Sequence, residues 1–202
     1  MKKIGVLCSG RGSNLEALIK NKEAGVLKAD IALVLSDNAD ARALSVAREH
    51  GIRAVHKDPG PKKTWIIPEI EHQWVQILKD FSVDIVCLAG FMRIIKKPLL
   101  AAFPGRILNI HPALLPAFPG LEVQKKALEY GVKFSGCTVH FVDDSVDGGP
   151  IICQAVVPIL DGDTPDTLAD RILKEEHRIY TEAVNLVVSG KFRIEGRRVI
   201  RI

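Results

Sequence analysis

The stretch that decides the fold is KIGVLCSGRGSNLEALI, residues 3–19. Its first six residues, KIGVLC, are rich in β-formers and almost uninterrupted in apolar character, which predicts a strand buried on both faces. From Leu15 onward, apolar residues recur at helical spacing, so a helix is expected after the glycine-rich turn SGRGSN. A buried strand that runs directly into a helix is the opening unit of an open α/β sheet.

The same alternation continues toward the middle of the chain. Further buried strands are expected at residues 31–35, 52–56, 83–89 and 106–110, with helices at 40–50 and about 69–80. Apolar strands that alternate with helices predict a Rossmann-like, mostly parallel sheet with helices on both faces.

The pattern changes after residue 135. The runs GCTVHFV (136–142) and IICQAVV (151–157) are strand-like and leave no room for a helix between them, so they predict an antiparallel hairpin. A long amphipathic helix is expected over residues 165–188, with Thr164 as its N-cap and Gly190 at its end. The fold class is therefore α/β, with a sheet that is mixed by its C-terminal antiparallel hairpin.

Chain length favours one domain over residues 1–202, because 202 residues fit the usual size of a single domain. The organisation predicts a parallel half at about 1–110, which would bind phosphate, and a catalytic half at about 111–202. The last residues, around the turn Glu195-Gly196, predict a small terminal hairpin.

Net charge is +4, and residues 191–202 alone carry it with five basic residues and one acidic residue. A basic tail on a neutral body is not the broad basic face of a nucleic-acid-binding protein, so no nucleic acid is expected as a partner. We expect the tail to be a solvated edge hairpin that matches no site motif.

Hydrophobic residues make up 47% of the chain, but no apolar run reaches the ~20 residues that a membrane span needs. No targeting segment is expected either. The four cysteines lie in apolar stretches without C-x-x-C spacing, so buried, reduced thiols and a cytoplasmic location are expected.

The first candidate site is the loop Gly10-x-Gly12-Ser13-Asn14 between the first strand and its helix. Backbone N–H groups at such a helix N-terminus favour an anion, and a monophosphate is the best ligand. A dinucleotide is a weaker alternative, because Leu15 occupies the third glycine position, although Asp37 ends the second strand where a ribose-binding acid would lie. An ordinary tight turn is the structural alternative.

The second candidate site lies at the end of the fifth strand. Alternation places Asn109 and His111 on the same side, and an amide beside an imidazole suits a carbonyl that becomes an oxyanion. A proline-rich loop, residues 112–120, follows them. The alternative is that Asn109 caps the strand and His111 is a structural histidine.

The third candidate site is an acidic turn with Asp143, Asp144 and Asp147. It imitates the opening of a calcium loop, but the twelfth position is Gln154, and no zinc-ligand spacing occurs, so no metal is expected. These acids are either solvated turn residues or supply one carboxylate that faces His111 and stabilises its protonated form.

These motifs together resemble the glycinamide ribonucleotide formyltransferase family, folate-dependent enzymes of purine synthesis. The resemblance covers nearly the whole chain and is carried by SGRGSN (9–14), DIVCLAGFMRI (84–94), LNIHPALLPAFPG (108–120) and GCTVHFVDDSVDGGPII (136–152). Relatives that act on methionyl-tRNA or hydrolyse formyltetrahydrofolate usually carry an extra domain, for which 202 residues leave no room.

The resemblance implies transfer of the formyl group of 10-formyltetrahydrofolate, a cosubstrate, to the amine of glycinamide ribonucleotide through a tetrahedral intermediate. Asn109 then contacts the formyl group and steadies the oxyanion, His111 is the catalytic proton donor, and Asp147 keeps that histidine protonated. The matching substrate-binding residues for glycinamide ribonucleotide are Gly12, Ser13, Asn14 and Glu176. Those for the folate are Met92, Arg93, Ile94 and Ile95, together with Asn109. The half at about 111–202 is the expected folate and catalytic half.

Some expectations stay open at this stage. A basic folate-side residue of the family has no clear counterpart before residue 69, and Lys63 is only a candidate. The alternative functions are a formyltetrahydrofolate hydrolase, another formyltransferase and, more remotely, a non-catalytic nucleotide-binding module. The expected partners are small-molecule substrates, and no association with a membrane is expected. The expected oligomeric state is a monomer or weak homodimer.

Overall fold

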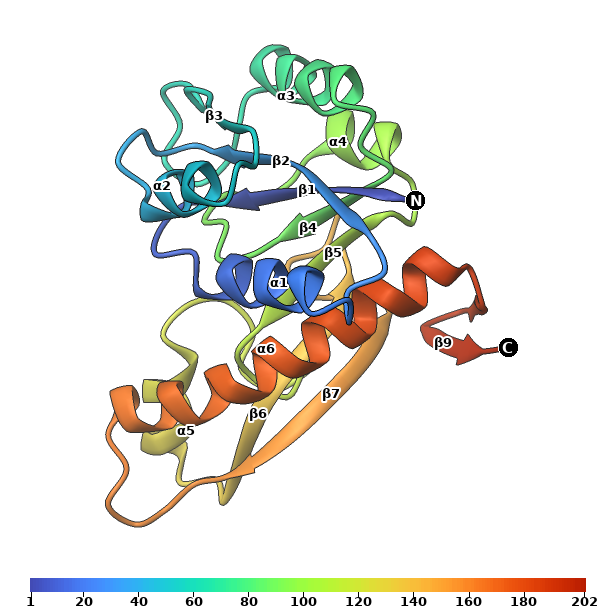
Figure 1. Cartoon of the computed structure of the whole chain (residues 1–202). Coiled ribbons are helices and arrows are strands. Elements are labelled where there is room, and N and C mark those ends of the chain that lie inside the picture. The colour runs from blue at the N-terminus through green and yellow to red at the C-terminus, as the bar shows by residue number, and fades with distance from the viewer.

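The computed structural model describes all 202 residues as nine strands in one sheet and six helices (Figure 1). The strands are β1 (Lys3–Cys8), β2 (Asp30–Ser36), β3 (Ala54–His56), β4 (Ile85–Leu88), β5 (Ile107–His111), β6 (Phe134–Phe141), β7 (Ile151–Pro158), β8 (Phe192–Glu195) and β9 (Arg198–Arg201). The helices are α1 (Ser13–Glu23), α2 (Arg42–Glu49), α3 (Pro68–Asp80), α4 (Lys97–Ala102), α5 (Val123–Tyr130) and α6 (Pro165–Ser189). The α/β class predicted from the sequence is confirmed.

Strand order in the sheet is β3-β2-β1-β4-β5-β6-β7-β9-β8. The first five strands pair in parallel, β6 pairs antiparallel with β5, and β7 pairs antiparallel with β6. The mostly parallel sheet and its antiparallel hairpin are therefore as expected. Two short helices, α4 and α5, lie in segments for which the sequence predicted none.

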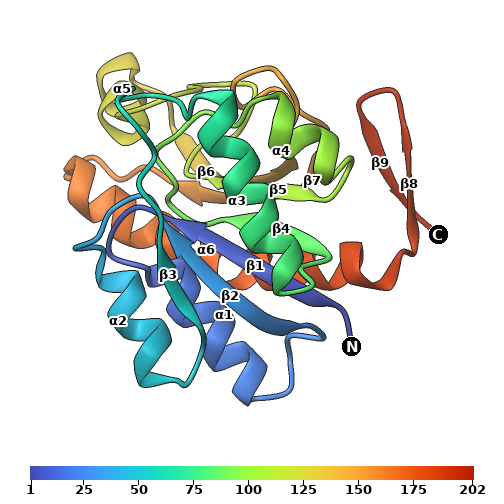
Figure 2. The ribbon, with the colours of Figure 1, turned by 90° about the horizontal axis from the view of Figure 1, so that it is seen from above.

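Two apolar cores lie on opposite faces of the sheet (Figure 2). The larger core contains side chains of α1, α2 and α6, and the smaller one contains side chains of α3 and α4. Strand β1 serves both, because Val6 belongs to the larger core and Leu7 to the smaller one. Coverage on both faces explains why these strands read as continuous apolar runs.

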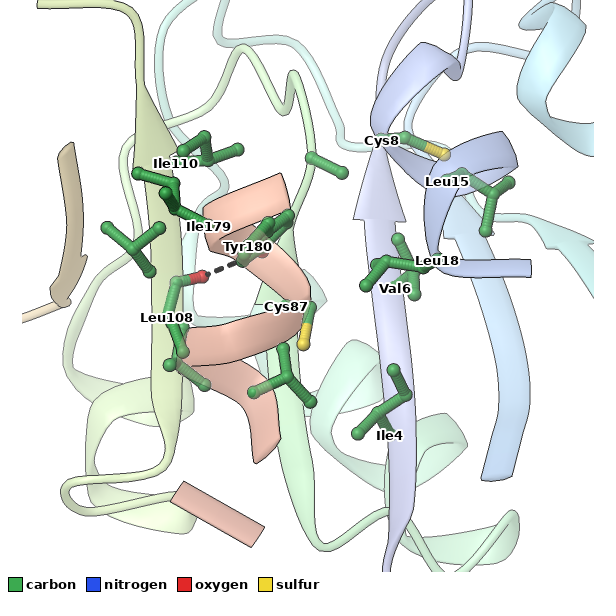
Figure 3. Packing of buried hydrophobic residues seen from close by; sticks show 14 of the residues in the cluster. Ile4, Val6, Cys8, Leu15, Leu18, Cys87, Leu108, Ile110, Ile179 and Tyr180 are labelled. Atoms are coloured by element: carbon green, nitrogen blue, oxygen red, sulfur yellow. Dashed lines mark hydrogen bonds between the residues drawn. The ribbon is translucent and has the colours of Figure 1, made fainter. Parts of the chain in front are cut away.

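Helix α6 is held at its ends and at its middle. Thr164 accepts a hydrogen bond from the Thr167 amide in a capping box, and Gly190 ends the helix at φ 67°, as the sequence predicted. In the core, the buried Tyr180 hydroxyl donates to the Leu88 carbonyl at 2.8 Å and lies 3.5 Å from that of Leu108 (Figure 3). These contacts fix α6 against the carboxyl end of β4 and the first residues of β5.

All four cysteines are free. Cys8, Cys87 and Cys137 are buried, whereas Cys153 is only half-buried, so the expectation of full burial is wrong for that residue. Its strand, β7, alternates between core and surface and leaves Cys153 partly covered by α6. None of the helices is long and apolar enough to cross a membrane.

Candidate active site

The candidate site residues gather at the carboxyl ends of the parallel strands, where open α/β sheets bind ligands. Residues 9–14 follow β1, residues 89–96 follow β4, and His111 is the last residue of β5. The loop between β6 and β7, residues 142–150, reaches the same edge, because its Asp147 lies against β5. Four chain segments that are far apart in sequence thus meet at one edge.

The phosphate loop depends on the backbone conformation of Gly12. This residue has φ 82°, and a Cβ atom there would lie 2.9 Å from Ala43. The turn lets α1 begin at Ser13, two residues earlier than its apolar periodicity indicates. The first N–H groups of a helix have no intrahelical acceptor, so they are available to an anion at this position.

Glu176 of α6 lies directly against this loop. The Asn14 side-chain amide donates to Glu176 Oε2 at 2.6 Å, and both residues are buried. Burial raises the pKa of the Glu176 carboxyl, and the Asn14 hydrogen bond partly offsets that effect. The Oδ1 atom of Asn14 is buried without a partner, so the loop retains an unsatisfied acceptor that a ligand donor would satisfy.

The structure brings Asn109, His111 and Asp147 together. His111 Nδ1 lies 3.5 Å from Asp147 Oδ2, and Asn109 Nδ2 lies 3.5 Å from Asp147 Oδ1. On the other side of the ring, His111 Nε2 lies 2.9 Å from the Phe118 carbonyl. Both ring nitrogens therefore face oxygen acceptors, an arrangement that an imidazole with two N–H donors satisfies completely.

Of the three acids in the β6–β7 loop, Asp147 alone turns toward His111. Its side chain is 13% exposed and also accepts a hydrogen bond from the Gly120 amide at 2.9 Å. Asp143 instead accepts from the Ser145 amide within the loop, and Asp144 is exposed. The proline-rich loop and the acidic loop thus enclose the imidazole from two sides.

His140 is a member of this cluster that sequence reasoning missed. It pairs with Asn109 across β5 and β6, and its Nε2 lies 3.3 Å from Asn109 Nδ2 and 3.8 Å from Asp147 Oδ1. Its Nδ1 lies 2.8 Å from the Phe141 carbonyl and therefore carries the proton, which leaves Nε2 to accept from the Asn109 amide. Burial lowers the pKa of His140, so this histidine is neutral and orients Asn109. The only sequence signal was its alternation with Thr138 on one face of β6.

The folate segment expected at residues 92–95 presents two apolar side chains to solvent. Met92 is 59% exposed and Ile94 is 39% exposed, whereas Ile95 is only 4% exposed and packs in the core. Met92 and Ile94 are therefore exposed apolar side chains in the segment that follows β4, whereas the Ile95 side chain is not available to a ligand.

The Arg93 guanidinium is held within the protein. It donates to Asp37 Oδ2 at 2.6 Å and to the backbone carbonyl groups of Lys62 and Lys63. Asp37 lies where a dinucleotide-binding protein has a free carboxylate for the ribose, but here that carboxylate is paired with Arg93. This pairing argues against a dinucleotide. Lys63 forms no salt bridge, so its ammonium group is free.

Ser9 connects the phosphate loop with the segment after β4. Its amide donates to the Gly90 carbonyl at 3.0 Å, and its hydroxyl accepts from the Met92 amide at 2.9 Å. The two loops are therefore joined directly through one residue.

A polar groove of about 480 Å³ lies between α1 and α6, apart from the histidine cluster. It touches the phosphate loop only at Ser13, and polar or charged side chains form most of its wall. The chemistry therefore gathers at the strand ends and not in this groove.

Comparison with known proteins identifies the family of this chain. Residues 2–184 match the formyl transferase family. The chain is 39% identical over 95% of its length to the phosphoribosylglycinamide formyltransferase of Escherichia coli strain K12 and spans 89% of that protein. It is 44% identical over 95% of its length to the trifunctional purine biosynthetic protein adenosine-3 of Gallus gallus, but spans only 19% of that relative.

Solved structures give the same result. Glycinamide ribonucleotide transformylase 1 from Symbiobacterium toebii superposes with a TM-score of 0.96 at 52% identity, covering 100% of this chain and 94% of that one. A formyltetrahydrofolate deformylase from Pseudomonas syringae superposes with a TM-score of 0.89 at 25% identity, and the chain covers 66% of it. With the family matched over most of its residues, this chain belongs to the formyl transferase family.

Proposed function

We propose that this chain transfers the formyl group of 10-formyltetrahydrofolate to the amine of glycinamide ribonucleotide. The products are formylglycinamide ribonucleotide and tetrahydrofolate, in de novo purine (IMP) biosynthesis, so the enzyme is a phosphoribosylglycinamide formyltransferase. The observation that carries the proposal is the Asn109–His111–Asp147 cluster at the same sheet edge as the phosphate loop.

The phosphate of the acceptor lies at the N-terminus of α1, against the N–H groups that follow Gly12. Ser13 and Asn14 belong to the first turn, where the helix dipole favours an anion. Glu176, buried beside Asn14, accepts hydrogen bonds from the acceptor's neutral donors. Binding at this position directs the amine toward β5.

The donor folate lies along residues 92–95, over the exposed Met92 and Ile94 side chains. Backbone groups of this segment supply its polar contacts, because the Arg93 guanidinium is already bound to Asp37. The free ammonium group of Lys63, on the neighbouring segment, is the candidate for the glutamyl carboxylate of the folate.

Asn109 and His111 stabilise the tetrahedral intermediate that forms when the amine attacks the formyl carbon. Each donor to the developing oxyanion is worth about 2.7–4 kcal/mol when removed. The Asn109 contact with Asp147, at 3.5 Å, is long and weak, so the amide readily redirects one N–H to the substrate oxygen.

His111 also moves the proton that the attacking amine loses and the folate nitrogen gains. Asp147 faces its Nδ1 and stabilises the charged ring, and such positioned proton transfer contributes roughly 10²–10⁴-fold to the rate. No acyl-enzyme is required. Burial raises the pKa of the Cys87 thiol to about 12 and that of Cys153 to about 11, so these thiols stay protonated and are poor nucleophiles.

Residues 1–202 act as one catalytic domain in this proposal. The two halves of the chain meet in the acceptor site, because Glu176 lies against Asn14. The folate segment follows β4 at the same sheet edge where His111 ends β5. The enzyme acts on small molecules in the cytoplasm as a monomer or weak homodimer.

A formyl-transfer assay with both substrates, with and without acceptor, tests the proposal. We expect formylglycinamide ribonucleotide only when acceptor is present, and a His111→Ala variant that keeps its fold by circular dichroism but loses about 10²-fold or more in kcat. Formyl release at the same rate without acceptor would instead identify a hydrolase, and an unaffected His111→Ala variant would remove the histidine from the chemistry.

A further inference from the structure

The terminal hairpin, residues 191–202, lies beyond residue 184, where the family match ends. It is formed by β8 and β9, as the sequence predicted (Figure 2), but the turn is Gly196-Arg197, one residue later than expected, because Glu195 still pairs with Arg198. The sequence also predicted a solvated edge hairpin that matches no site motif. Strand β8 is indeed the largely exposed edge of the sheet, but the hairpin also contacts the loop that carries Asp147.

The hairpin docks at the end of the sheet nearest that loop. Strand β9 pairs with β7 through Arg198 and Ile151, the first residue after the loop. Phe192 stacks on the buried Phe141 with ring centroids 5.6 Å apart, next to His140. The hairpin is therefore seated on the two strands that begin and end the loop.

Arg197 extends this contact into the loop itself. Its Nη2 donates to the Gly148 carbonyl at 2.6 Å, directly after Asp147. No other side chain from outside residues 142–150 hydrogen-bonds to the backbone of this loop. Arg197 forms no salt bridge, so its guanidinium has this carbonyl as its hydrogen-bond partner.

The loop needs such a restraint because its backbone is strained at Asp147. That residue has φ 51°, in the left-handed region, which costs conformational energy for residues other than glycine. Relaxation of this residue would turn the carboxylate away from His111 Nδ1, which lies only 3.5 Å from it. A hydrogen bond to the next carbonyl opposes that relaxation.

We propose that Arg197 is a positioning residue, which holds the Gly148 carbonyl and thereby keeps Asp147 against His111. The inference rests on the proposed function of the His111–Asp147 pair. It assigns to the basic tail a part in catalysis that acts through the loop and does not touch substrate.

The test compares Arg197→Met, which keeps the stem but removes the donors, with Arg197→Lys, which keeps a charged donor. Arg193→Met is the matched control, because Arg193 lies in the same hairpin but pairs with Glu195. Loss of one hydrogen bond from a charged donor predicts a fall in kcat of about fivefold to tenfold for Arg197→Met. The KM for glycinamide ribonucleotide stays unchanged, since the phosphate loop is elsewhere, and Arg197→Lys recovers most of kcat.

Hydrogen–deuterium exchange of the free proteins provides a readout that does not depend on the reaction. Peptides that cover residues 142–150 should exchange faster in Arg197→Met than in the wild type or Arg193→Met. If the wild type transferred no formyl group, the proposed function would be wrong. The exchange experiment would still test whether Arg197 restrains residues 142–150.

If the wild type is active, two outcomes would overturn the proposal. One is a kcat for Arg197→Met equal to that of Arg193→Met. The other is loss of the circular dichroism of the folded chain in Arg197→Met, because the arginine would then hold the fold as a whole and not the loop.

Discussion

Nδ1 of His111 lies 3.5 Å from Oδ2 of Asp147, although 36 positions separate them in the sequence. The other oxygen of the same carboxylate faces Asn109 and His140, at 3.5 Å and 3.8 Å. One carboxylate, 13% exposed, therefore lies within 3.5–3.8 Å of the other three polar side chains of the cluster.

We expect Asp147→Asn to lower kcat by about 10²-fold, because a neutral amide cannot stabilise the charged imidazole during proton transfer. Steady-state kinetics across a range of pH would measure this loss of kcat. Asp144→Asn, an exposed neighbour in the same loop, is the control and should keep wild-type kcat. Equal kcat values for the two variants would contradict the assigned role.

Glu176→Gln should stabilise the free protein and weaken the binding of the acceptor. Burial raises the pKa of Glu176 in the folded state, so its ionised form costs stability at neutral pH, and glutamine removes that cost. The gain in melting temperature should shrink as pH falls and the native carboxyl becomes protonated.

The same variant should raise the KM for glycinamide ribonucleotide about tenfold, because a hydrogen bond to a charged group is lost. Glu175→Gln, whose carboxylate pairs with Arg178 on the outside of α6, should leave this KM unchanged. A destabilised Glu176→Gln would show that the charge of Glu176 stabilises the fold.

His140 should make the protein less stable as the solution becomes more acidic. Burial lowers its folded pKa below 6.5, so the unfolded chain binds the proton first, and the free energy of unfolding falls as pH drops below about 6.5. His140→Gln should flatten this part of the stability curve, measured by urea unfolding between pH 5 and pH 8.

His177 provides the comparison for that experiment. Its pKa is also lowered by burial, so His177→Gln should flatten the curve as well, but only His140→Gln should reduce kcat through Asn109. A curve that His140→Gln leaves unchanged would mean that folding does not change the pKa of this histidine, which would contradict the effect of its burial.

Gly12→Ala should destabilise the free protein by about 1–2 kcal/mol or more, since φ 82° is costly for alanine and the new Cβ would meet Ala43. It should also raise the KM for the phosphorylated acceptor by displacing the first turn of α1. Gly10→Ala, which meets no atom within 4 Å, is the control for stability. Thermal unfolding would separate the two, and equal melting temperatures would contradict the steric argument.

Much of the sheet could be predicted because its strands are buried on both faces and stand out as apolar runs. Helix α6 could be predicted as well, since a capping threonine and a terminal glycine bound a long periodic stretch. In contrast, α4 has only six residues, too few for a periodic signal, and contains Pro98. Helix α5 buries only Val123 and Ala127, so its apolar pattern is weak.

The sequence did not predict those parts of the site that depend on the register between neighbouring strands. Asn109 and His111 could be nominated from the end of one strand, but His140 joins them only because β6 pairs with β5 at that position. The pairing of β6 with β7 also has a register irregularity between Val139 and His140, and no residue type in the sequence predicts it. The Arg197 contact crosses 49 positions and follows from how the hairpin docks.

The hydrogen bonds of Ser9 imply that the affinities for the two substrates are energetically linked. A ligand that orders residues 9–14 also limits the motion of Gly90 and Met92, which reduces the entropy that a second ligand must remove. Linkage then requires reciprocity: the factor by which the ribonucleotide tightens folate binding equals the factor by which folate tightens ribonucleotide binding. For the function proposed above, Ser9, directly after β1, is therefore the residue through which binding of one substrate would favour binding of the other.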